Sequence, residues 1–180
     1  MVRAALVVDS RRRRDAKGVT HAATDAAASV VACLVGRADA VSAELSARDR
    51  AVVAAQLGRA PRAMRAVAHR CPCWLPDVVE TSPRLTDGTP FRTLYYLTCP
   101  RAASAIGRLE AGGLMREMTD RLQEDPALAE RYAAAHADYL RRRDAIDVLP
   151  GSPSAGGMPA RVKCLHVLVA HSLAVGRGVN

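Results

Sequence analysis

The amino-acid sequence predicts an α+β domain in which a short antiparallel sheet packs with four or five helices. Two short runs rich in Val, Tyr and Thr, at about 77–82 and 91–98, have a composition typical of strands, and a third short run at about 64–69 is also predicted as a strand. After residue 99, apolar side chains recur at helical spacing in several successive segments. These patterns predict a three-stranded antiparallel meander over about 64–98, with helices before and after it.

Length and composition limit the domain organisation. The chain has 180 residues and a net charge of +8, and only 3 % of its residues are aromatic. This length fits one domain of ordinary size, whose core must be built from Ala, Val and Leu. Residues 1–44 carry no clear capping signal, so we expect a poorly defined N-terminal extension. Residues 45–180 then form a single domain with a Gly-, Pro- and Ser-rich loop at 147–159.

The first helix and the sheet have recognisable boundaries. Ser46 is a good N-cap and Gly58 is a stop signal, so a helix is predicted between them. The strands are expected over about 64–69, 77–82 and 91–98. The pair Asp87-Gly88 lies between the last two and predicts a turn, because glycine readily adopts a positive φ.

The helices after the sheet are bounded by proline and glycine. Pro100 suits the first position of a helix, where its missing N–H would have no partner. Predicted helices cover about 100–111, 114–125, 128–143 and 159–175. The last of these is apolar on almost every side, which predicts that it is buried inside the domain.

Four cysteines lie at the ends of predicted elements and form the main candidate site. Cys71 and Cys73 follow the first strand, Cys99 ends the third, and Cys164 lies in the predicted last helix. If the sheet edge and the helix meet, four thiolates could hold zinc or an iron–sulfur cluster. Three histidines add ligand capacity: His69, His166 and His171. The sequence leaves open that these cysteines are simply small buried residues.

The spacing of Cys164 and His166 predicts how their side chains are oriented relative to each other. Cys164 and His166 are two positions apart, and on an ideal helix their side chains point about 160° apart. We therefore expect His166 to lie on a different face of the last helix from Cys164.

A thiol-dependent enzyme is the first alternative. Cys99 precedes Pro100 at a predicted helix start, a position that favours the thiolate form of cysteine. A histidine beside it could then make it a nucleophile or a redox thiol. An anion site is predicted at the start of the last helix, from Gly156, Gly157, Arg161 and Lys163. Cations in the first turn of a helix are unfavourable unless an anion is bound there.

A basic interaction module is the second alternative. The positive net charge and the run Arg141–Arg143 favour nucleic acid or an acidic protein as a partner. The sequence shows no membrane segment, because the apolar run over 26–36 is shorter than the about 20 residues that a membrane helix needs. The run over 4–8 precedes Arg11–Arg14, the reverse of the order in a signal peptide. We therefore expect a cytoplasmic protein.

Several blocks resemble the bacterial domain-of-unknown-function 501 family, whose members are mostly actinobacterial and cytoplasmic. The resemblance covers about residues 46–180, and the blocks are His69–Cys73, Thr93–Pro100, Arg108–Glu110, Gly157–His166 and Ala170-His171. The family has no established activity, so the resemblance implies no catalytic residue. It also implies a small residue, often glycine, at the position that Trp74 occupies here.

Overall fold

The structure is a computed structural model that describes residues 45–151, 154 and 159–176, and the predicted N-terminal extension lies outside these residues. The described part contains three strands and five helices, which confirms the α+β class. The elements are α2 (Ala47–Leu57), β1 (Met64–Arg70), β2 (Pro76–Thr81), β3 (Tyr95–Leu97), α3 (Pro100–Ala111), α4 (Leu114–Glu124), α5 (Pro126–Asp144) and α6 (Leu165–Val175).

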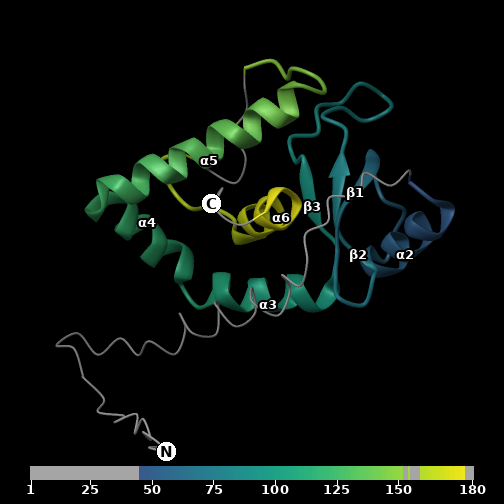
Figure 1. Ribbon diagram of the computed structural model, residues 1–180, viewed down its shortest axis with the longest axis horizontal. Helices are drawn as coiled ribbons and strands as arrows, with labels where there is room; N and C mark the ends of the chain where they lie inside the picture. The colour runs from purple at the N-terminus through teal and green to yellow at the C-terminus, as the bar shows by residue number, and fades with distance from the viewer. Residues whose placement is uncertain (1–44, 152–153, 155–158, 177–180) are drawn as a thin grey trace, which may run out of the picture.

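The sheet is the predicted antiparallel meander, in the order β1-β2-β3. β2 is the central strand and is covered on both faces, because successive side chains of a strand point to opposite sides. Val78 belongs to the large core cluster with α6, whereas Val79 belongs to a smaller cluster with Val53 of α2. Figure 1 accordingly shows α6 on one side of the sheet and α2 on the other.

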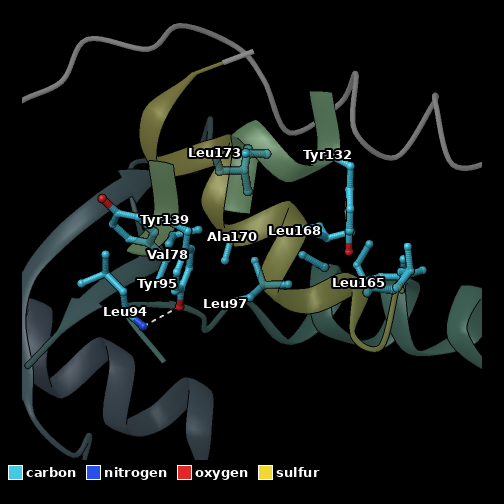
Figure 2. Packing of buried hydrophobic residues seen from close by; sticks show 14 residues of the cluster. Val78, Leu94, Tyr95, Leu97, Tyr132, Tyr139, Leu165, Leu168, Ala170 and Leu173 are labelled. Atoms are coloured by element: carbon cyan, nitrogen blue, oxygen red, sulfur yellow. Dashed lines mark hydrogen bonds between the residues drawn. The ribbon is translucent and has the colours of Figure 1, made fainter. Parts of the chain in front are cut away.

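The last helix is the centre of the large core, as its composition predicts. Figure 1 shows α6 seen along its axis, with α5 above it, α3 below it and the sheet beside it. In Figure 2, Leu168 and Leu173 of α6 lie within the same cluster as Tyr139 of α5. Ala170, also on α6, is fully buried and lets the helix approach the sheet closely.

The start of this helix differs from the prediction. α6 begins at Leu165 rather than at Pro159, and the preceding residues are held by hydrogen bonds to other helices. Val162 N–H donates to Thr119 Oγ1 in α4 at 3.1 Å. These tertiary bonds compete with helix formation over 159–164, and they cannot be read from local sequence.

The third strand is shorter than predicted. β3 covers only Tyr95–Leu97, and the Leu94 N–H donates to the Tyr139 hydroxyl at 2.6 Å, shown as a dashed line in Figure 2. A side chain from α5 thus replaces a strand partner at this point. The Asp87-Gly88 turn is confirmed, because Gly88 has φ 82° and Asp87 Oδ1 accepts from Thr89 N–H at 2.9 Å.

The helix α2 begins and ends where the sequence predicts. Ser46 Oγ accepts from the Asp49 N–H at 3.0 Å, and Gly58 ends the helix with φ 67°. Asp49 also accepts two hydrogen bonds from Arg70 at the end of β1, at 2.8 and 2.9 Å. This two-point ion pair attaches the helix to the end of β1 that leads into the Cys71–Cys73 turn.

Candidate metal centre at the start of the last helix

Three possible metal ligands meet where α3 ends and α6 begins. They are Glu110 in the last turn of α3, Cys164 at the N-cap of α6 and His166 in its first turn. One donor atom from each lies within 4.8 Å of the other two, and all three side chains are partly buried. In the part of the chain that the structure describes, no other three or more His, Cys, Asp or Glu side chains come this close.

The backbone at Cys164 explains why this cluster forms. Cys164 has φ −151° and ψ 115°, so it is extended and lies just outside the helix. The ideal-helix angle between Cys164 and His166 therefore does not apply. The expectation that the two side chains point to different faces was wrong, because the helix begins one residue later than Cys164.

Glu110 connects the two helices. Its Oε1 accepts a hydrogen bond from the Leu165 N–H at 2.6 Å and lies 3.1 Å from His166 Nδ1. A carboxylate at a helix N-terminus is favourable because the first N–H groups are unpaired and the helix dipole is positive there. Partial burial raises the pKa of Glu110, but the hydrogen bonds from Leu165 and His166 outweigh it, so the net pKa lies below its usual value.

The ring of His166 is oriented by its second nitrogen. Its Nε2 lies 3.1 Å from the Ala103 carbonyl oxygen in α3, and because a carbonyl only accepts, Nε2 carries the hydrogen. Nδ1 then faces the Glu110 carboxylate with either a proton or a lone pair. A histidine that donates one N–H to a backbone carbonyl and presents its other nitrogen is the usual arrangement of a metal-binding histidine.

Cys164 provides the third donor. The side chain is partly buried, and burial raises the pKa of its thiol; the nearby Glu110 carboxylate acts in the same direction, against hydrogen bonds from the Val167 and His166 N–H groups. The thiol form is therefore favoured when no cation is present. A bound metal ion would reverse this preference, because it binds the thiolate and releases the proton.

The structure does not form the predicted site of four thiolates. Cys71 and Cys73 are joined to each other by a disulfide, so neither sulfur is free to act as a thiolate. Cys99 is at the N-cap of α3 as predicted, but its side chain makes no capping hydrogen bond and packs partly against the core. Of the four cysteines, only Cys164 lies in a cluster of three potential ligands.

The other two candidate histidines are each paired with a buried carboxylate. His69 Nδ1 lies 2.7 Å from Asp77 Oδ1 across β1 and β2. His171 Nε2 lies 3.0 Å from Asp138 Oδ2 in α5, and its ring stacks on Tyr95 with centroids 5.9 Å apart. Both histidines are buried, and their contacts connect β1 to β2 and α6 to α5.

The two basic residues of the predicted anion site do not lie in the first turn of α6, where the prediction placed them. Gly156 and Gly157 lie outside the described residues. Arg161 and Lys163 are exposed, and both precede α6 rather than lying in its first turn. The premise of unbalanced cations at the helix start was therefore wrong, and the anion at this start is the carboxylate of Glu110 itself.

Sequence reasoning missed Glu110 as a site residue. A signal was present, because a negative charge in the last turn of a helix opposes the helix dipole. An acidic residue there, two positions after Arg108, indicates a partner outside its own helix.

The fold and this cluster define a small α+β protein with a candidate three-ligand metal centre. The chain belongs to the family described as "Protein of unknown function (DUF501)", whose model matches residues 67–180. The match includes Glu110, Cys164 and His166, whereas residues 46–66 of the expected resemblance lie outside it. No curated protein and no solved structure shows significant similarity to the chain. Within the described residues, none of the helices combines the length and the apolar character that crossing a membrane requires.

Proposed function

We propose that this protein binds a zinc ion through Glu110, Cys164 and His166. The observation that supports the proposal most strongly is the meeting of an oxygen, a sulfur and a nitrogen donor within 4.8 Å. The two residues of α6 and the one of α3 approach from different elements, so the cluster depends on the tertiary fold. The orientation of His166 by the Ala103 carbonyl adds the outer contact that metal-binding histidines usually have.

The separations between donors suit zinc after small movements. In a tetrahedral zinc site with bonds of about 2.0–2.3 Å, neighbouring donors lie roughly 3.3–3.6 Å apart. Glu110 Oε1 and His166 Nδ1 are already 3.1 Å apart, and the longest separation in the cluster is at most 4.8 Å. Shortening a separation of at most 4.8 Å to the distance between neighbouring zinc ligands requires side-chain movements of about 1 Å.

The donor set favours zinc over an iron–sulfur cluster. Such clusters are held mainly by thiolates, and only one thiolate is present at this site. Glu110 Oε1 accepts from the Leu165 N–H, and this bond is compatible with metal binding because a carboxylate oxygen has a second lone pair. Three protein ligands would leave the fourth zinc position to water or to an incoming ligand.

Such an ion would have a structural or regulatory effect. It would connect the end of α3 to the start of the buried helix α6, and α6 packs against the sheet. Metal binding would thus stabilise the folded chain, because a ligand that binds only the folded state shifts the folding equilibrium.

Cobalt substitution tests the proposal. Co²⁺ bound to a thiolate gives a sulfur-to-metal charge-transfer band in the near ultraviolet, and a tetrahedral site gives visible ligand-field bands. Metal-free protein is prepared and Co²⁺ is then added. The variant with both Cys71→Ser and Cys73→Ser should give both signals, whereas Cys164→Ser should lose the charge-transfer band. Glu110→Ala and His166→Ala should each weaken binding by at least about tenfold.

Cys99→Ser is the matched control, because Cys99 is also a partly buried N-cap cysteine. It should bind Co²⁺ and Zn²⁺ like the unmodified protein. A charge-transfer band that survives Cys164→Ser, or that disappears in the Cys71→Ser and Cys73→Ser protein, would show that the metal site lies elsewhere.

A further inference from the structure

The turn between β1 and β2 carries chemistry that the metal site does not use. Cys71 and Cys73 are joined across a single residue, with their Cα atoms 5.3 Å apart. Cys73 is exposed and Cys71 is partly buried. Trp74, the only tryptophan of the chain, follows directly and is 77 % exposed. The disulfide therefore lies at the surface, at the tip of a hairpin.

This disulfide is poorly placed to stabilise the fold. The chain-entropy contribution of a disulfide grows with the length of the loop that it closes, and here the two cysteines are only two positions apart. It joins neither two elements nor two distant segments. Exposed disulfides of this kind are the ones that thiols reduce readily.

The turn is also held by contacts that do not involve sulfur. The Cys71 N–H donates to the Leu75 carbonyl at 3.0 Å, and the Trp74 N–H donates to the Cys71 carbonyl at 2.8 Å. Arg70 donates to the Trp74 carbonyl at 3.2 Å while it is paired with Asp49. None of these bonds involves sulfur, so we expect them to hold the hairpin tip after reduction and to keep the two thiols close together.

We propose that Cys71 and Cys73 form a thiol–disulfide exchange site that takes thiolates, from dithiol or monothiol reductants, as its substrates. An incoming thiolate attacks the exposed sulfur of Cys73 and forms a mixed disulfide, and the sulfur of Cys71 leaves as a thiolate and takes up a proton. A second thiol group of the reductant then attacks the mixed disulfide and releases Cys73. The two cysteines gain two electrons and two protons, and the reductant leaves as its disulfide.

The site is independent of the proposed zinc centre, and its test uses different residues. The oxidised protein is equilibrated with mixtures of reduced and oxidised glutathione, and with dithiothreitol, under native conditions. Alkylation followed by mass spectrometry of the tryptic peptide 71–84 reports the state of these two cysteines alone. The emission of Trp74 provides a second readout, because a disulfide quenches an adjacent indole.

As the ratio of reduced to oxidised glutathione changes, Cys71 and Cys73 of the native protein should convert reversibly between the disulfide and two thiols. Peptide 71–84 should report this conversion, and Trp74 emission should change in parallel. The circular-dichroism spectrum and the cooperative melting transition should be retained after reduction. A disulfide that reduces only when the protein unfolds would overturn the proposal. So would a pair of thiols that stays reduced in excess oxidised glutathione.

Two single variants test which sulfur is attacked. Cys71→Ser leaves the exposed Cys73, and Cys73→Ser leaves the partly buried Cys71. With oxidised glutathione, the remaining thiol of Cys71→Ser should form the mixed disulfide about tenfold faster than that of Cys73→Ser, since exchange requires access to the sulfur. Equal rates, or the reverse order, would contradict attack at Cys73.

Discussion

Replacing Glu110 in metal-free protein separates its charge from its hydrogen bond. Glu110→Gln keeps an oxygen that can accept from the Leu165 N–H but removes the negative charge at the start of α6. The charge contributes at most about 1 kcal/mol, since the interaction with the start of α6 is worth about 0.3–1 kcal/mol, a partly exposed pair with His166 adds little, and the position of Glu110 in the last turn of α3 acts in the opposite direction. Glu110→Ala also leaves the N–H of the buried Leu165 unpaired, which adds about 2 kcal/mol.

The expected order of stability at neutral pH is therefore unmodified protein, Gln variant and Ala variant, with losses of at most about 1 and 3 kcal/mol. Urea unfolding followed by circular dichroism, with a chelator present, measures these free energies. Glu130→Gln is the matched control, because Glu130 is an exposed glutamate of α5 that lies outside the first and last turns of its helix. It should cost no more than about 0.5 kcal/mol.

The pH dependence gives an independent check of the charge effect. The pKa of Glu110 is lowered in the folded protein from an ordinary value of 4.5. Its stabilisation is therefore fully present above the unfolded value and is lost as the pH falls through the folded pKa. The gap between the unmodified protein and the Gln variant should therefore shrink as the pH falls below 4.5 and through the folded pKa. A gap that persists unchanged at pH 3, or equal losses in the Gln and Ala variants, would refute this account of Glu110.

Three further predictions concern the metal, the core and the sheet edge. Zinc at about one hundred times its Kd should raise the free energy of unfolding by about 2.7 kcal/mol, and Cys164→Ser should abolish this gain in thermal melts. Tyr139→Phe removes the acceptor of a buried backbone N–H and should cost about 1–3 kcal/mol in urea unfolding, whereas Tyr132→Phe, which loses only a 3.4 Å contact, should cost less. Asp49→Asn should cost about 2 kcal/mol, because the hydrogen bonds from Arg70 hold the pKa of Asp49 below its usual value of 3.8. That cost is present above the unfolded pKa and should shrink as the pH falls through the folded one; a constant cost down to pH 2 would contradict it.

Local signals predicted most of the fold and only part of the candidate site. The cap at Ser46, the first helical residue Pro100 and the turn at Gly88 were all predictable, because each depends on backbone geometry within a few residues. Cys164 and His166 were also recognised as possible ligands. Their relative orientation was not, because it depends on whether the helix begins before or after Cys164.

The structure explains why the family resemblance implies a small residue at the position of Trp74. The family resemblance implies a small residue there, often glycine, and Trp74 adopts φ 62°. This left-handed conformation favours glycine, because a Cβ atom approaches the backbone. The turn after Cys73 therefore sets the backbone requirement, and the exposed indole meets it at a conformational cost.

Residue types and their spacing were enough to predict the class of the domain, its antiparallel meander and the burial of its last helix. These properties follow from residue type and spacing, which act over a few positions. The tertiary structure alone decided that Glu110 reaches the start of α6, since the two bonded groups are 55 positions apart. It also brings the sulfur atoms of Cys71 and Cys73 together in a disulfide. A metal centre needs several donor atoms within a few ångströms, and only the packed chain brings distant residues that close.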